Sequence, residues 1–148
     1  MWDSLWHLRG TTPVPHAMPD PEVIERIERL LGQQRKPVTS RAARALVFEA
    51  PFWWASLNAN WLAMLIYERG RFRIENDTRG RVIRYELRSF CCFLLCLFVA
   101  GIFFLLGLRL EGLVDGIAGA AFAFAWLYGA NLAFARARIP GTIRKALE

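Results

Sequence analysis

Two long apolar stretches dominate the second half of the chain. The first covers residues 90–108 without a charged residue, an amide or a proline, and the second covers residues 117–135. About 20 consecutive apolar residues cross the hydrocarbon core of a bilayer as a helix, so each stretch predicts a membrane-spanning helix. The short connection between them carries charged residues. We therefore predict a two-helix transmembrane hairpin over residues 89–135.

The first half of the chain contains one clear helical pattern. Asp20, Pro21 and Glu22 form a favourable helix start, because aspartate caps free backbone N–H groups and proline is tolerated at the first helical position. Apolar residues then recur at helical spacing up to Leu31, and Gly32 is expected to end this amphipathic helix. The Glu and Arg residues on its outer face are interpreted as solvated charges.

Short runs with β-branched and aromatic residues predict a small antiparallel sheet. Residues 71–75 and 82–88 alternate apolar and charged positions, and the turn residues between them predict a β-hairpin. The runs 45–50 and 62–67 are interpreted as buried strands, although periodicity alone does not separate them from helix. Residues 62–88 then form a three-stranded meander that leads directly into the first apolar stretch.

The predicted fold class is α+β. A small cytoplasmic domain, made of one amphipathic helix and a three- to four-stranded antiparallel sheet, precedes the two-helix transmembrane hairpin. We expect an irregular N-terminal arm over residues 1–19, the α+β domain over 20–88, the hairpin over 89–135 and a basic cytoplasmic tail over 136–148. So small a domain has a small core, and its stability is expected to depend on the membrane or on a partner.

The segment 51–61 is rich in tryptophan and uncharged. Its preferred interpretation is a loop or short helix at the bilayer surface, where an indole ring buries its apolar body and keeps its N–H hydrated. Packing in the domain core is one alternative. A third membrane span, formed together with residues 62–67, is another. Five tryptophans are assigned to the membrane interface or to partner docking: Trp2, Trp6, Trp53, Trp54 and Trp61.

The net charge of +6 is explained mainly by arginines beside the apolar stretches. Because the loop of the hairpin is weakly acidic, the positive-inside rule places both termini in the cytoplasm. Five arginines are assigned to contact with anionic lipid head groups: Arg71, Arg73, Arg81, Arg84 and Arg88. Topological anchoring and docking of an acidic protein are the alternatives for this cluster. The preference for arginine favours a bacterial inner membrane, and no nucleic-acid partner is expected.

Small residues recur at every fourth position of the second apolar stretch, at Ala121, Ala125, Gly129 and Ala133. Such a stripe lets two helices approach closely, either within the hairpin or against another subunit. Trp126 lies near the middle of the stretch, away from the interfacial positions that tryptophan favours, and is expected to contact protein. These five residues form the predicted helix-packing interface.

The sequence contains no recognisable pattern of catalytic, cofactor-binding or metal-binding residues. Cys91, Cys92 and Cys96 are expected to be reduced thiols, and they lack the histidine or second cysteine pair of a metal site. His7 and His16 have no nucleophile or carboxylate arrangement beside them. We therefore predict that the chain is not an enzyme and binds no cofactor, metal or small-molecule substrate.

These observations favour a noncatalytic accessory or assembly subunit of a larger bacterial inner-membrane complex. It would pack through its hairpin and dock through its cytoplasmic domain, with membrane lipids and other membrane-protein subunits, or a second copy of the chain, as partners. A self-contained membrane regulator, such as an immunity or sensor protein, is the alternative. A homo-oligomeric pore is less favoured, because neither apolar stretch contains a charged residue that would line an ion pathway.

Overall fold

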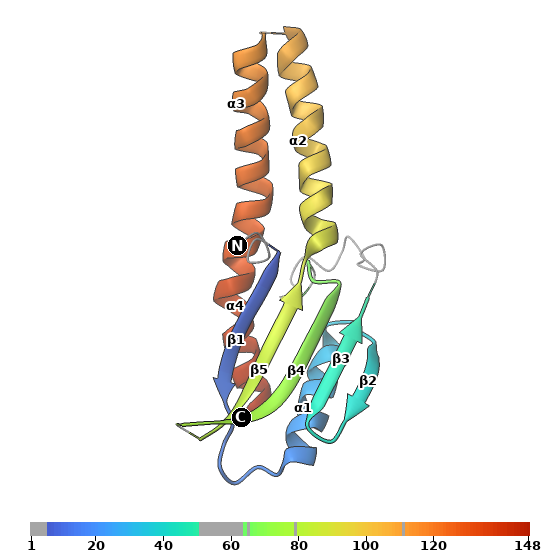
Figure 1. Cartoon of the computed structure of the whole chain (residues 1–148), viewed down its shortest axis with the longest axis vertical. Coiled ribbons are helices and arrows are strands. Elements are labelled where there is room, and N and C mark those ends of the chain that lie inside the picture. Colours follow the sequence, from blue (N-terminus) through green and yellow to red (C-terminus); the bar gives the residue numbers. More distant parts are fainter. Residues whose placement is uncertain (1–5, 51–63, 65, 79, 111) are drawn as a thin grey trace.

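A computed structural model of the chain describes residues 6–50, 64, 66–78, 80–110 and 112–148 (Figure 1). Within these residues the fold is α+β, as predicted, with one five-stranded antiparallel sheet and three helices. The elements in chain order are β1 (His7–Pro13), α1 (Asp20–Gln33), β2 (Val38–Ala42), β3 (Ala45–Glu49), β4 (Arg69–Asp77), β5 (Gly80–Arg88), α2 (Phe90–Leu110), α3 (Leu113–Phe124), the π-helical turn η4 (Ala125–Gly129) and α4 (Ala130–Leu147). The last three form one continuous helix.

The strands lie in the order β1-β5-β4-β3-β2, and every neighbouring pair is antiparallel. The predicted β-hairpin is confirmed as β4 and β5, in which Phe72 lies opposite Tyr85 and Ile74 opposite Ile83. β3 pairs directly with β4 and supplies the first strand of the meander. The sheet has five strands instead of three to four, because the edge strands β1 and β2 extend it on both sides.

Both edge strands come from residues with little strand pattern. β1 lies in the segment predicted as an irregular arm, and that prediction is wrong for residues 7–13, which pair with β5 along their whole length. Leu8 is the only large apolar side chain that β1 buries. β2 exposes nearly all its side chains, and its register with β3 shifts between Val38 and Ser40. Such irregular, polar edges protect a sheet from pairing with other chains.

The stretch 62–67 is described at Met64, Ile66 and Tyr67, and these residues form no strand, contrary to the prediction. Two polar side chains that follow α1 hold their backbone instead. Gln34 Oε1 accepts a hydrogen bond from Met64 N–H at 3.2 Å, and Lys36 Nζ donates one to the carbonyl of Tyr67 at 2.7 Å. The side chains of Met64 and Tyr67 are fully buried, so these residues enter the core as a connecting segment.

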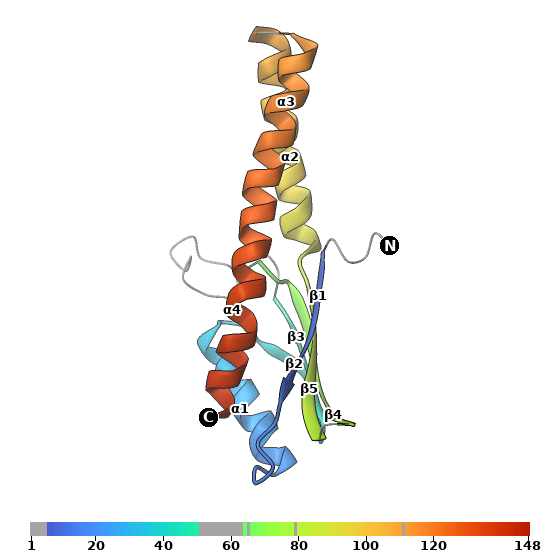
Figure 2. The ribbon, with the colours of Figure 1, turned by 90° about the vertical axis from the view of Figure 1, so that its left-hand side faces the viewer.

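The core lies between the sheet and two helices, α1 and the C-terminal part of α4, which cover the same face of the sheet (Figure 2). Residues 136–147 were assigned to a basic tail, but they are helical and enter this core. Ile139, Ile143 and Leu147 are buried there, each one turn after the last, while the charged residues between them stay outside. We call the sheet, α1 and this part of α4 the sheet domain.

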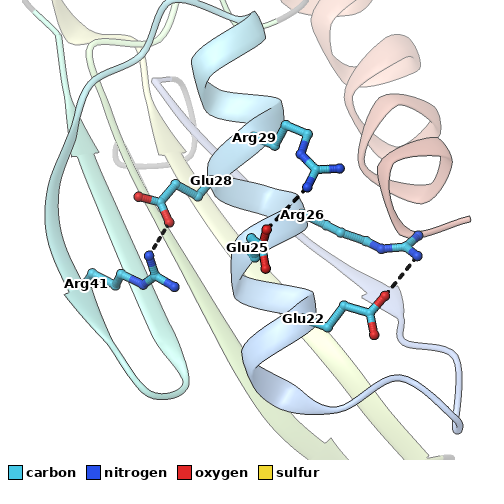
Figure 3. A network of polar contacts seen from close by, with 6 residues as sticks. All are labelled: Glu22, Glu25, Arg26, Glu28, Arg29 and Arg41. Atoms are coloured by element: carbon cyan, nitrogen blue, oxygen red, sulfur yellow. Dashed lines mark hydrogen bonds and ion pairs between the residues drawn. The ribbon is translucent and has the colours of Figure 1, made fainter.

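Helix α1 begins at Asp20, as predicted, but the carboxylate of Asp20 does not cap it. This side chain instead pairs with Arg44 at 2.9 Å and with Arg81. The helix ends at Gln33, so Gly32 lies inside it rather than beyond its end. On its outer face the predicted solvated charges form ion pairs with one another and with β2, shown in Figure 3: Glu22–Arg26 at 3.0 Å, Glu25–Arg29 at 3.3 Å and Glu28–Arg41 at 2.6 Å. The first two pairs are four residues apart on the helix, and exposed pairs at this spacing stabilise a helix by about 0.3–0.5 kcal/mol each.

Two helices are long and apolar enough to cross a membrane: α2, with 21 residues, and the continuous helix that begins with α3, with 35. They lie side by side and extend away from the sheet domain (Figures 1 and 2). Two glycines allow their close approach, because a Cβ atom on Gly107 would stand 2.7 Å from the Cα of Gly116. Only 17% of the most apolar part of α2, and 11% of that of the longer helix, is buried within the protein.

The π-helical turn η4 adjusts the rotation of the longer helix. Ala123 and Tyr128 are both buried, although they are five residues apart. In an α-helix with 3.6 residues per turn, five residues would place them about 140° apart. The wider turn absorbs one extra residue, so the buried side of α3 continues into Ala135 and Ile139 of α4. One helix thus packs against α2 at one end and against the sheet at the other.

Candidate functional site

The face of the sheet opposite the helices is open (Figure 2). Outward positions of β1, β5 and β4 lie in rows across it, as the strand register shows. One row holds Arg88 and Arg69, the next holds Arg9, Glu86 and Arg71, and the third holds Thr11, Arg84 and Arg73. Alternation of side chains along a strand sends the apolar residues between these positions into the core. We call this surface the arginine face.

The glutamates of the arginine face neutralise only some of its arginines. Glu86 binds Arg9 at 2.7 Å, and Glu75 binds Arg84 at 3.1 Å with Arg73 more distant at 4.0 Å. Arg71 makes no ion pair with the residues that the structure describes. A shallow groove at this point is lined by four arginines and two glutamates, together with Thr11 and the edges of Gly10 and Tyr85: Arg9, Arg71, Arg73, Arg84, Glu75 and Glu86. The groove therefore carries an excess of two positive charges.

Two pairs of arginines face each other directly across β4 and β5. Arg73 lies opposite Arg84, and Arg69 lies opposite Arg88. Like charges at directly opposed positions destabilise a sheet. Each pair is accompanied by a glutamate, Glu75 for the first and Glu49 for Arg69, which lowers but does not remove the repulsion. These positions are exposed to solvent, where uncharged polar side chains would be equally compatible with the sheet. The fold itself therefore does not require the paired arginines.

The five arginines predicted to contact lipid do not form one surface. Arg71, Arg73, Arg84 and Arg88 are outward residues of the sheet, whereas Arg81 has the opposite parity on β5. Arg81 instead binds the carboxylate of Asp20 and donates to the carbonyl of Met18 at 2.7 Å. It therefore ties β5 to the beginning of α1, at the end of the strand remote from α2.

The junction between the sheet and α2 is a second polar site. β5 ends at Arg88 and α2 begins at Phe90, so Ser89 alone connects them. The Glu68 carboxylate accepts a hydrogen bond from the backbone N–H of Cys91 at 2.7 Å and lies 3.6 Å from Arg88. A carboxylate at this place satisfies a free N–H group and the positive end of the helix dipole. The sheet domain thus fixes the direction in which α2 leaves it.

Hydroxyl groups complete this junction. Ser89 Oγ lies 3.3 Å from the hydroxyl of Tyr128, and its backbone N–H donates to the carbonyl of Trp6 at 2.8 Å. Tyr67 is fully buried nearby and its hydroxyl has no hydrogen-bond partner among the described residues. Burial raises the pKa of Tyr67 far above its ordinary value, so its phenol stays protonated. These hydroxyl groups lie beside the Glu68 carboxylate and Arg88, and they add neutral polar contacts between Ser89 and Tyr128.

The predicted helix-packing stripe does not pack within the hairpin. Ala121, Ala125, Gly129 and Ala133 are all exposed, while Gly116, Ala123 and Tyr128 occupy the buried side of the same helix. Trp126 is 67% exposed and its ring stacks on Phe122, with centroids 6.3 Å apart. The close approach of the hairpin therefore depends on glycines that lie outside the stripe, and the stripe itself has no partner among the described residues.

The tryptophans predicted at the interface are described in one case only. Trp6 is half-buried. Its ring contacts Phe90 edge-on, with ring centroids 5.6 Å apart, and Phe93 in a tilted arrangement, with centroids 5.5 Å apart. It thus covers the beginning of α2, where a bilayer surface would lie. The others, Trp2, Trp53, Trp54 and Trp61, lie outside the described residues, as does the whole segment 51–61.

The cysteines are free, and Cys92 and Cys96 of α2 are buried in one cluster with Tyr128. No group of three or more His, Cys, Asp or Glu side chains that would hold a metal ion occurs in the part of the chain that the structure describes.

Arg9 and Glu68 are among the residues of these sites that were not identified from the sequence. Arg9 belongs to the segment taken as an irregular arm, and its place on the arginine face follows from the pairing of β1 with β5. The alternation of Leu8 and Thr12 with polar residues is a weak signal for that strand. Glu68 precedes β4, and nothing in its local sequence indicates that it caps α2.

Comparisons of the chain with models of protein families, with curated proteins and with solved structures find no match. The functional interpretation therefore follows from the geometry of the arginine face, the junction and the exposed hairpin.

Proposed function

We propose that the chain is a noncatalytic accessory or assembly subunit of a larger bacterial inner-membrane complex. The hairpin of α2 and α3 with η4 anchors it in the bilayer and packs against another subunit, and the sheet domain docks on the cytoplasmic side. Membrane lipids and other membrane-protein subunits, or a second copy of the chain, are its partners. Neither a cofactor nor a small-molecule substrate is part of this proposal.

The exposed apolar surface of the hairpin is the observation that carries the proposal. Large side chains such as Phe98, Leu110 and Val114 are between 68% and 79% exposed. A helix in the core of a water-soluble domain would bury most of such residues. The 21 residues of α2 span about 32 Å as a helix, which matches a hydrocarbon core of about 30 Å.

The face that carries the stripe supports packing against a further helix. Its small residues are exposed on the side away from α2, and the stacked rings of Phe122 and Trp126 lie beside them. Small residues bring membrane helices into close contact, and a tryptophan far from the bilayer surface is better accommodated by protein than by lipid. A single hairpin leaves this surface facing lipid, whereas an additional subunit would cover it.

Purification at native expression level after gentle detergent extraction tests the proposal. Gly129→Leu fills the stripe, and Gly101→Leu is a matched control on α2, since neither glycine has any atom within 4 Å of an added Cβ. We expect the wild type and Gly101→Leu to migrate as part of a larger complex and Gly129→Leu to migrate as the free chain. A wild type that is a partnerless monomer would contradict the proposal.

A membrane regulator that passes a signal between the hairpin and the sheet domain is the second candidate. The direct connection of β5 to α2 and the continuity of α3 with α4 favour it, because a movement of either helix reaches the sheet without a flexible linker. Deletion of the gene separates the two candidates. Loss of one large complex supports the subunit, whereas sensitivity to one toxin or stimulus supports the regulator.

A further inference from the structure

We propose that the arginine face binds an acidic, extended segment of a partner polypeptide. This inference rests on the proposed function and deepens it, because it names the chemistry that the sheet domain recognises. The binding region is the groove of Arg9, Arg71, Arg73 and Arg84. Carboxylates of the partner pair with guanidinium groups that the glutamates of the face leave available.

The distance from the hairpin excludes lipid as the principal ligand of this groove. Arg84 precedes Ser89 by five residues of strand, which corresponds to about 17 Å at 3.4 Å per residue. The strands and α2 extend along the same long axis of the molecule (Figure 1), so this length separates Arg84 from the start of the apolar helix. A head-group layer is about 5–8 Å deep and the Debye length is about 8 Å. Head groups therefore reach Arg88 and Arg69 but not the row of Arg84 and Arg73.

The composition of the face also disfavours nucleic acid. Glu75 and Glu86 lie between the arginines and would repel a continuous phosphate backbone. The outward positions of β1, β4 and β5 include no Phe, Tyr or Trp on which bases would stack. Separate carboxylates on a peptide avoid these glutamates, because an extended chain presents alternate side chains about 6.8 Å apart, the same spacing as the rows of arginines.

The availability of the guanidinium groups supports the pairing. Arg73 and Arg84 are 56% and 62% exposed, and both depend on the single carboxylate of Glu75. Arg71 makes no ion pair with the described residues. Guanidinium groups bind carboxylates through two parallel hydrogen bonds, and a ligand that brings more carboxylates would relieve the repulsion between Arg73 and Arg84.

Fluorescence anisotropy with the full chain in nonionic detergent tests the proposal. The probes are a labelled 12-residue peptide of alternating Glu and Thr, in which every second side chain is a carboxylate, and the corresponding Gln–Thr peptide. We expect the acidic peptide to bind at least about tenfold more tightly than the neutral one, with an affinity that falls as salt is raised. Equal binding of the two peptides would overturn the proposal.

Matched variants locate the binding. Arg73→Gln with Arg84→Gln removes two charges from the face, and Arg138→Gln with Lys145→Gln removes two exposed charges from α4. We expect at least about a tenfold loss for the first pair and less than about twofold for the second. The single variant Arg71→Gln disturbs no ion pair of the fold and is expected to weaken binding by about threefold. Equal losses in both double variants would contradict the proposal.

Two further outcomes would overturn it. Binding of the acidic peptide that disappears when the chain is moved from neutral to anionic-lipid nanodiscs would show that head groups occupy the face. The second outcome concerns a single-stranded RNA of equal charge. If this RNA binds more tightly than the peptide and loses affinity in the Arg73/Arg84 variant, the arginine face binds a phosphate backbone instead. Neither result depends on the larger complex, so failure of this proposal is distinguishable from failure of the subunit proposal.

Discussion

At the scale of single residues, Lys36 is the least ordinary feature of the sheet domain. Its side chain is 6% exposed, its ammonium donates to the carbonyl of Tyr67, and it lies 6.0 Å from the ring centre of Phe48. Desolvation lowers the pKa of Lys36 to about 8, and the nearby carboxylate of Glu68 offsets only part of that effect. The ammonium is therefore retained at neutral pH at the cost of some stability.

This burial predicts a specific pH dependence of stability. Between pH 8 and 10 the unfolded chain keeps the proton of Lys36 while the folded chain loses it, so the free energy of unfolding rises with pH. We expect the rise to be on the order of 2 kcal/mol by pH 10, and to be absent in Lys36→Met. Denaturant unfolding of both chains in nonionic detergent from pH 7 to 10 measures it, and parallel profiles would contradict it.

The pH range has an upper limit set by two tyrosines. Burial raises the pKa of Tyr67 and of Tyr85, so above about pH 10 the unfolded chain loses phenolic protons that the folded chain keeps. That difference lowers the free energy of unfolding as pH rises further, opposite to the effect of Lys36. The comparison with Lys36→Met removes this contribution, because both chains contain the tyrosines.

The arginines show what the sequence reveals at this scale and what it does not. The sequence pattern along β5 places Arg81, Arg84 and Arg88 in one cluster. Positions 81 and 84 differ by an odd number, however, and therefore lie on opposite faces of the strand. Strict use of the strand period would have separated them. The position of Arg9 on the arginine face could not be predicted. Its partner Glu86 is distant in sequence, and only the pairing of β1 with β5 brings the two residues together.

At the scale of elements, long and regular patterns were predictable and short polar ones were not. The β4–β5 hairpin and both apolar helices follow from alternation and from uncharged length. β1 and β2 were missed because edge strands bury few side chains and thus leave little periodic signal. The role of α4 was missed because Ile139, Ile143 and Leu147 are separated by charged residues that suggested a solvated tail.

The π-helical turn yields a prediction at this scale. Deletion of Ala125 removes the extra residue of η4, so the helix becomes regular and its two buried sides stay in phase. Deletion of Ala137, an exposed residue of α4, rotates Ile139 and Ile143 by about 100° out of the core. We expect the first variant to melt close to the wild type and the second to lose the cooperative transition of the sheet domain, as circular dichroism in detergent would record.

Each deletion serves as the control for the other, because both remove one exposed alanine from the same continuous helix. If the deletion of Ala125 were as damaging as the deletion of Ala137, η4 would have a function beyond the alignment of two faces. Its position between the part of the helix that meets α2 and the part that meets the sheet would then make it a candidate hinge.

At the scale of the whole molecule, the first strand and the last helix of the described residues belong to one structural unit. β1 pairs with β5, and α4 packs on the same sheet together with α1, while α2 and α3 extend from it as a pair (Figure 1). A strand and a helix that share a core lie on one side of any membrane that the hairpin crosses. The fold thus provides a reason for a common location of the termini that is independent of the distribution of charge.

Compartment-specific reporters test this arrangement. We expect reporters fused before residue 6 and after Glu148 to report the same compartment, and a reporter inserted at Gly112, between α2 and α3, to report the opposite one. The positive-inside rule predicts that the compartment of the termini is the cytoplasm, because arginines lie at the sheet end of both helices. Opposite locations of the two termini would require the shared core of β1 and α4 to be absent from the membrane-bound protein. Three reporters in one compartment would show that the hairpin does not cross the bilayer. The exposed apolar surface of α2 and α3 would then have to be covered by another protein.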